Sequence, residues 1–206
     1  MKKIMFDDKY GLTQAVIEGR KTMTRRAVPE KLIRVIEGGS PGFAVMESKY
    51  KVGEVVAVAQ NYEQAGWMPD VLQQVFVDKP TIFPDLDKYS SLCGWIDLPF
   101  KYHKGWTNKM FVRADLMPHQ IRITNIRVER LRDISDEECM KEGIREKSNF
   151  PHKKSLPFYF DGGKHSWDNS FSTPRQAFAA LIDKVFGKGT WDSNPWVFVY
   201  EFELVK

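Results

Sequence analysis

The apolar residues of the chain follow helical spacing in some segments and strand spacing in others. Helices are predicted where apolar residues recur three or four positions apart, where an N-capping residue opens a segment, or where glycine ends one. These helices cover residues 12–18, 29–37, 136–142 and 174–186. Strands are predicted where apolar residues alternate or form short buried runs, over residues 2–6, 22–26, 55–59, 120–132 and 196–205. The expected fold class is therefore α+β.

The longest predicted strand changes the parity of its apolar residues partway along. Ile121 and Ile123 occupy alternate positions, but the next apolar residues are Ile126 and Val128. A β-bulge near positions 124–125 explains the change, because a bulge inserts one residue into one strand and bends it. Bends of this kind suit the corners of a small barrel.

Two helices begin with clear local signatures. Ser135 and Glu138 form a capping box, in which each side chain accepts a hydrogen bond from the other residue's backbone N–H, and Gly143 marks the end of that helix. Thr173 and Pro174 begin the last helix as an N-cap and a first-turn proline.

Three segments show no sustained periodicity. The stretch between the glycines at 38–39 and Tyr50 is predicted to be a loop. Residues 64–108 and 145–172 are interpreted as two irregular insertions in a single domain over residues 1–206, the second of them a mobile surface loop. In the first insertion, the expected role of Trp67, Trp95 and Trp106 is a local satellite core rather than base stacking.

Composition narrows the class of protein. The chain has 206 residues, a net charge of +4 and 42% hydrophobic residues, which suit a packed interior. Its longest apolar run has six residues, whereas a membrane-spanning helix needs about 20, and its start lacks the apolar core of an export signal. The two cysteines and four histidines have no metal-ligand spacing. We expect a cytoplasmic protein that has no membrane segment, metal or cofactor.

The stretch over residues 18–26, Glu-Gly-Arg-Lys-Thr-Met-Thr-Arg-Arg, places four cations and two hydroxyls beside a helix-ending glycine. On the residues alone, the cations suit a solvated or phosphate-binding face, and the threonines suit a strand. Lys21 is a nucleophile only when deprotonated, which like charges and burial favour and a helix C-terminus opposes. A site shared by Lys21 and Thr24 requires the lysine to lie in the turn before the strand, because residues three apart on a strand face opposite sides.

The order of the predicted helices, strands and motifs along the chain resembles that of the ASCH family, a branch of the PUA-like β-barrels. The resemblance is greatest to its longer members, which are found in phages and prophages. The resemblance covers residues 10–30, 50–62, 117–144 and 174–205. Its most specific marker is Gly-x-Lys-x-x-Thr-x-Arg, here Gly19, Lys21, Thr24 and Arg26. The resemblance implies a small PUA-like β-barrel with helices packed on it and a cleft lined by this motif.

One short bacterial branch of that family hydrolyses the amide of acetylcytidine with a lysine nucleophile, a threonine proton acceptor and a glutamate proton donor. The resemblance implies these roles for Lys21, Thr24 and Glu142, the last placed by aligning the helix that precedes Gly143. The residues expected to contact the ligand are Gly19, Arg20, Arg25, Arg26 and Gln60.

At the end of the predicted strand over residues 55–59 the sequence departs from the family. Longer members commonly carry a glutamate there, as Glu-Thr-Trp, whereas this chain has Gln60-Asn61-Tyr62. An acid role is lost, but the Gln60 amide both donates and accepts hydrogen bonds and could bind a base edge. The alternative is an ordinary polar residue at a strand end.

Two functions remain open. The first is a small amidohydrolase acting on a modified nucleoside. The second is a PUA-like module that binds RNA or a nucleotide through the basic residues of the 18–26 stretch, without chemistry. Arg122, Arg127, Arg130 and Arg132 would extend a basic track in the second reading, although strand arginines often only solvate a face.

Overall fold

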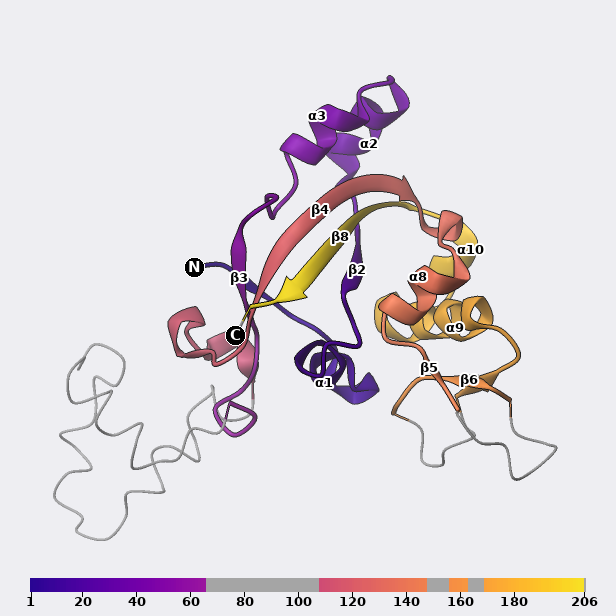
Figure 1. The fold of residues 1–206 in the computed structure, drawn as a ribbon. Helices are drawn as coiled ribbons and strands as arrows, with labels where there is room; N and C mark the ends of the chain where they lie inside the picture. The colour runs from indigo at the N-terminus through magenta and orange to yellow at the C-terminus, as the bar shows by residue number, and fades with distance from the viewer. Residues whose placement is uncertain (66–107, 148–155, 163–168, 206) are drawn as a thin grey trace, which may run out of the picture. The chain divides into compact units, whose positions relative to one another are not determined.

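The computed structural model describes residues 1–65, 108–147, 156–162 and 169–205 (Figure 1). The chain divides into two compact units, the first holding Met1–Met5 and Ala57–Pro118, the second Phe6–Val56 and His119–Lys206. The tryptophans predicted to form a satellite core lie outside the described residues. Whether the two units make up the single domain expected over residues 1–206 stays a prediction.

Helices and strands are mixed along the described chain, which confirms the α+β class. The α-helices are α1 (Leu12–Ile17), α2 (Glu30–Glu37), α3 (Pro41–Met46), α8 (Asp136–Lys141), α9 (Pro174–Phe186) and α10 (Thr190–Ser193). The strands are β1 (Lys3–Ile4), β2 (Met23–Ala27), β3 (Val55–Val58), β4 (Gln120–Arg130), β5 (Arg145–Glu146), β6 (Phe158–Tyr159), β7 (Ser170–Phe171) and β8 (Trp196–Leu204). Their hydrogen-bonded orders are β1-β3-β4-β8-β2 and β5-β6-β7, and neither sheet closes into a barrel within the described residues.

In the second unit, β8 is the central strand between two antiparallel neighbours. Tyr200 lies opposite Thr24 of β2 on one side and opposite Ile126 of β4 on the other. Figure 1 shows β4 and β8 curving side by side. The register of this pair shifts between Ile123 and Asn125, which confirms the predicted bulge.

Strand β8 is buried on both faces rather than on the one face that its alternation suggested. Phe198, Tyr200 and Phe202 are buried on the expected face, but Val197 and Val199 on the other face are buried as well. An antiparallel sheet can leave one face to water, but here helix α9 lies on the second face as well, where its Ile182 and Phe186 line one cavity with Val197.

The first unit holds β1 and the last two residues of β3. Lys3 and Ile4 pair in parallel with Ala57 and Val58. The Lys3 amine donates to the carbonyl of Val112 at 2.7 Å and also to the carbonyls of Lys109 and Met110. This amine therefore ties β1 to the short 3-10 helix over Lys109–Phe111.

Two predictions of irregular structure are wrong where the structure describes them. The stretch after residues 38–39 contains α3, which begins at Pro41 but leaves Phe43 and Met46 exposed. Without a buried stripe this helix has no amphipathic signal in the sequence. The second insertion contains β5, β6 and β7, each two residues long, which is too short to show a period.

Helix α8 has the predicted capping box. The Ser135 hydroxyl accepts from the backbone N–H of Glu138 at 3.2 Å, and the Glu138 carboxylate accepts from the N–H of Ser135 at 3.4 Å. Helix α9 begins as expected, with the Thr173 hydroxyl accepting from the N–H of Gln176 at 3.1 Å. Both helix starts follow from local hydrogen bonding, which is why the sequence reveals them.

Ser135→Ala should lower the free energy of unfolding by about 1 kcal/mol, because it leaves an N-terminal N–H of α8 without its acceptor. Urea unfolding monitored by circular dichroism measures this loss. Ser193→Ala, at the last position of α10, is the matched control, since it caps no helix start. Equal stabilities of the two variants would contradict a role for the cap.

Candidate active site

Lys21 lies in the turn between α1 and β2, before the strand begins. Gly19 has a φ of 71°, a left-handed conformation that glycine adopts without strain. The backbone N–H of Lys21 then donates to the carbonyl of Ala15 at 2.9 Å, which closes the turn. This is the position that a site shared with Thr24 requires.

The Lys21 amine is buried against Glu142. The residue is only 2% exposed, and its Nζ donates to the Glu142 backbone carbonyl at 2.7 Å and to the Glu142 carboxylate at 2.5 Å. The ring of Phe6 lies 5.8 Å from the same Nζ. Two residues that are 121 positions apart in the sequence thus share one ion pair.

Burial shifts the pKa of this amine. Loss of water lowers the pKa of Lys21 below its usual value, the Glu142 carboxylate opposes that shift, and the positive charges of Arg26 and Arg25 add to it. Burial and the two arginines therefore make the neutral amine easier to form than in a free lysine.

Glu142 reaches Lys21 because Gly143 lets the end of α8 come close to α1. Glu142 is the C-cap of α8, and Gly143 follows with a φ of 106°. A Cβ on Gly143 would stand 3.3 Å from a Leu12 methyl carbon and 3.7 Å from the Lys21 side chain. A side chain at position 143 would be strained by this φ, and Leu12 would have to shift by a few tenths of an ångström to make room for it.

Lys21, Thr24 and Glu142 line one small pocket in the second unit. Its cavity volume is about 40 Å³, which is room for a few atoms rather than for a nucleoside. The remaining lining residues are Phe6, Asp7, Leu12, Arg25, Arg26, Phe178, Leu181, Ile182, Val185 and Phe186. The pocket is therefore apolar on the α9 side and charged where the three predicted residues converge.

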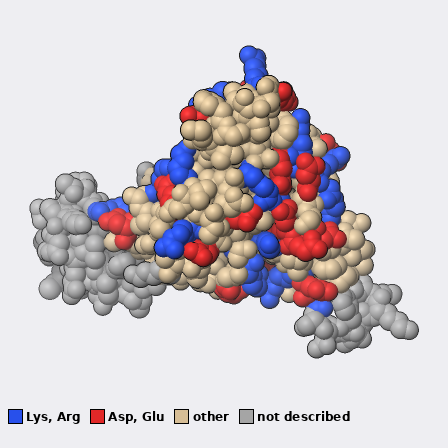
Figure 2. Space-filling view, turned by 45° about the horizontal axis from the view of Figure 1, so that its top comes forward, with Lys and Arg blue, Asp and Glu red and all other residues tan. Residues whose placement is uncertain are grey.

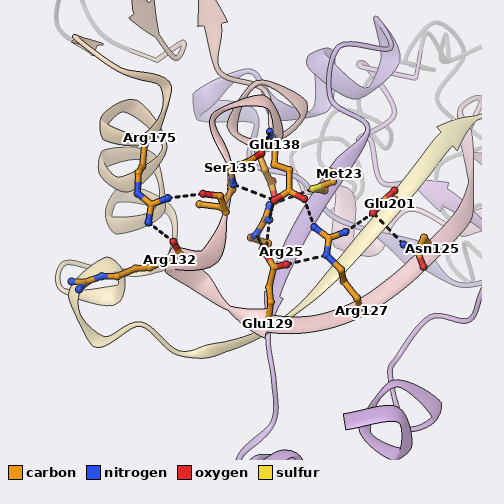
Figure 3. A network of polar contacts seen from close by, with 12 residues as sticks. Met23, Arg25, Asn125, Arg127, Glu129, Arg132, Ser135, Glu138, Arg175 and Glu201 are labelled. Carbon is orange, nitrogen blue, oxygen red and sulfur yellow. Dashed lines mark hydrogen bonds and ion pairs between the residues drawn. The ribbon is translucent and has the colours of Figure 1, made fainter.

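Arg25 stands behind the pocket at the centre of a network of carboxylates (Figure 3). Its Nη2 donates at 2.6 Å to both Glu129 and Glu138, and its Nη1 donates to Glu142 at 3.1 Å. Its Nε also donates to Glu129, at 3.0 Å, and its Nη1 contacts the Met23 sulfur at 3.3 Å. Because all five guanidinium N–H groups have protein partners, Arg25 orients Glu142 rather than reaching for a ligand.

Arg127 extends this network along β4. Its guanidinium donates to Glu129 at 2.9 Å and also contacts Glu138 and Glu201 (Figure 3). Arg25 and Arg127 both lie opposite Val199, on the two sides of β8. The acids that join them were missed by sequence reasoning, although Glu138 was recognisable as a capping residue.

Of the other residues expected to contact a ligand, Arg26 lines the pocket, whereas Gly19, Arg20 and Gln60 do not. Arg26 is half-buried, lines the pocket and stands 5.6 Å from the Phe6 ring. Arg20 is partly exposed and pairs with Glu18 at 2.6 Å, and neither Arg20 nor Gly19 lines the pocket. Gln60 belongs to the first unit, where its buried amide donates to the Gln64 carbonyl at 2.9 Å.

On the part of the surface that the structure describes, many basic side chains lie beside acidic ones. Figure 2 shows acidic and basic side chains interspersed on the face in view. Each arginine of the anticipated basic track has an acidic partner: Arg122 with Glu203, Arg127 with Glu201, Arg130 with Glu37 and Arg132 with Asp192. These four arginines are therefore partly neutralised, and Lys21 and Arg25 are buried, so these six described cations are poorly placed to hold a phosphate backbone.

Other chemistries find little support in the described residues. No group of three or more His, Cys, Asp or Glu side chains is arranged there to hold a metal ion. Burial raises the pKa of the Cys139 thiol to about 12, so this cysteine is a poor nucleophile. None of the described helices combines the length and apolarity that crossing a membrane requires.

The Lys21 amine should make folding stability rise with pH. Its folded-state pKa lies below 10.5, so between that value and pH 10.5 the unfolded chain binds more protons than the folded chain. Stability therefore increases as the pH rises through this window, by at most about 1.4 kcal/mol per pH unit, and is lost as the pH falls. Urea unfolding of the wild type and of Lys21→Met, compared at each pH, isolates this one group. A difference that does not change with pH would contradict the shift.

Because comparisons with known proteins found no match, the resemblance to the ASCH family rests on the motif residues alone. No family model, curated protein or solved structure matches the chain.

Proposed function

We propose that this protein is an ASCH-type amidohydrolase that removes an acyl group from an N-acylated nucleobase or nucleoside, such as acetylcytidine, and that its sheets belong to a PUA-like architecture. One observation carries the proposal. Lys21, Thr24 and Glu142 come from a turn, a strand and a helix end, and all three line one pocket in which the lysine amine is buried.

The first chemical requirement is a base, and the Lys21–Glu142 contact can supply one. At 2.5 Å, a proton can pass directly from the ammonium to the carboxylate. The transfer leaves a neutral amine and a carboxylic acid side by side. Burial lowers the pKa of Lys21 and so makes the neutral amine that this transfer leaves easier to form.

Chemical balance favours Thr24 over Lys21 as the nucleophile. Attack by the lysine amine would turn one amide into another, and the acyl-lysine would be as hard to hydrolyse as the substrate. Attack by the threonine hydroxyl gives an ester, which water cleaves more easily. A hydroxyl activated by a neighbouring amine is an established pairing for nucleophilic catalysis. We therefore assign Lys21 as proton acceptor and Thr24 as nucleophile, the reverse of the roles that the resemblance implies.

In the acylation step, each proton that moves has a donor and an acceptor among these three residues and the substrate. Lys21 takes the proton of the Thr24 hydroxyl as its oxygen bonds to the amide carbon. Glu142 gives its proton to the departing amine as the C–N bond breaks. The products are a free amine, an acyl-threonine ester and the Lys21–Glu142 ion pair.

Deacylation returns the site to its starting state. A proton passes again from Lys21 to Glu142, and the neutral lysine takes a proton from an entering water that attacks the ester. The same proton then returns to the Thr24 oxygen as the carboxylic acid leaves. The charged group of Arg26, which lines the pocket, supplies the stabilisation that the tetrahedral oxyanion needs in both steps.

The experiment is to incubate the purified protein with acetylcytidine and with acetanilide, and to follow release of cytidine or aniline by chromatography. Thr24→Val should abolish turnover, whereas Thr22→Val should not, because Thr22 does not line the pocket. Mass spectrometry of protein quenched during turnover should find the acyl group on Thr24.

Each other outcome has a definite meaning. An acyl group on Lys21 would overturn the assignment of the nucleophile. Saturable binding of both compounds without turnover would make the protein a nucleoside-binding module and overturn the enzyme proposal.

A further inference from the structure

A second cavity in the second unit lies against the pocket of Lys21. Its volume is about 220 Å³. Arg25, Ile182 and Phe186 line both cavities, so the two cavities adjoin at these three side chains. The other lining residues of the second cavity are Ala27, Leu131, Thr190, Pro195 and Val197.

The size of the second cavity suits one planar ring. It exceeds the roughly 150 Å³ that is known to accommodate benzene, and it is smaller than the roughly 300 Å³ at which pockets for drug-sized ligands begin. The pocket of Lys21, at about 40 Å³, has no room for such a ring. A substrate that carries both an acyl group and a ring can therefore place only the acyl group in the pocket of Lys21.

The lining chemistry points to an aromatic ring. The walls are apolar except for Thr190 and Arg25. The N–H groups of Arg25 are already taken, mostly by acids, and its guanidinium carbon lies 5.9 Å from the centroid of the Phe178 ring. The planar group therefore takes part in this lining as a stacking surface for aromatic rings rather than as a hydrogen-bond donor. Phe186, 45% exposed, offers a second flat surface where the two cavities adjoin.

We infer that this second cavity binds the aromatic ring to which the acylated nitrogen is attached, while the pocket of Lys21 receives the acyl group. The substrate class is thereby narrowed to aryl and nucleobase amides, in which the ring and the carbonyl are separated by a single nitrogen. The division of the substrate between the cavities rests on the proposed function, but binding of the ring does not.

The test measures binding of cytidine and of aniline, which contain the ring and lack the acyl group. Isothermal titration calorimetry or saturation-transfer NMR should detect at least one of them on the wild type, with a comparable affinity for Lys21→Met. Ala27→Phe, which fills the cavity from an exposed strand position, should weaken that binding at least tenfold. Thr190→Phe fills it from the opposite side and should do the same.

Thr124→Phe is the matched control, because Thr124 is an exposed strand residue that lines neither cavity. Unchanged affinity in folded Ala27→Phe and Thr190→Phe would overturn the ring site, as would failure of the wild type to bind either probe. Binding of aniline without cytidine would uphold the ring site and exclude the nucleoside. Ring binding without turnover of any amide would remove the proposed function and leave the ring site standing.

Discussion

Lys21→Arg should abolish amide hydrolysis while leaving the protein folded. Arginine keeps a cation beside Glu142, but it does not lose its proton in proteins and so cannot act as the base. Loss of a general base typically lowers the rate about 10²- to 10⁴-fold. Initial rates of cytidine release from acetylcytidine measure the effect, and the urea midpoint reports the fold.

Two further variants make this result specific. Lys141→Arg carries the same substitution at an exposed lysine that does not line the pocket, and it should hydrolyse like the wild type. Lys21→Met removes the charge as well as the base and should be equally inactive, which guards against a misfolded arginine variant. Hydrolysis by Lys21→Arg at the wild-type rate would exclude Lys21 as the proton acceptor.

Arg25→Met should cost about 3 kcal/mol of folding stability, the largest loss that we expect from a single substitution. The Arg25 side chain is 1% exposed and holds three carboxylates together. Without it, Glu129, Glu138 and Glu142 remain close to one another with less positive charge between them. Removing one partner of a buried ion pair costs about 3–5 kcal/mol, and the partial exposure of Glu129 and Glu138 places this case at the lower end.

Arg20→Met provides the comparison, because it removes an arginine from the same stretch of sequence. Arg20 pairs with Glu18 in partly exposed surroundings, and such pairs contribute less than about 1 kcal/mol. Urea unfolding should therefore separate the two variants clearly. Equal losses would mean that the carboxylates relax into solvent when Arg25 is absent, and that Arg25 does not hold Glu142 in place.

Arg25 also fixes which oxygen of Glu142 faces Lys21. Glu142 has two carboxylate oxygens, one facing Arg25 and the other facing Lys21. The guanidinium thus leaves one oxygen free to exchange a proton with the lysine amine. Because that oxygen lies 2.5 Å from the Lys21 amine, Glu142 is placed within the hydrogen-bond distance that proton transfer to this group requires.

Much of the fold could be predicted because its signals are local. The capping box at Ser135 and Glu138, the bulge between Ile123 and Asn125, and the turn at Gly19 depend on neighbouring residues, and all three are present in the structure. Helix α3 was missed because its larger apolar residues Phe43 and Met46 are exposed, so no buried stripe marks it. The three strands of the small sheet were missed because two residues cannot display an alternation.

The sequence by itself determined the class of fold, the start of the helix that presents Glu142 and the presence of a lysine in a tight turn. It did not determine that Lys21 and Arg25 are buried while Arg20 is not, since all three belong to the same basic run. Only the tertiary structure decided this, by bringing the end of α8 against the turn after α1 and surrounding two of the cations with carboxylates from distant segments. The physical reason is that charges are buried when partners compensate for the lost water, and those partners are more than 100 positions away in the chain.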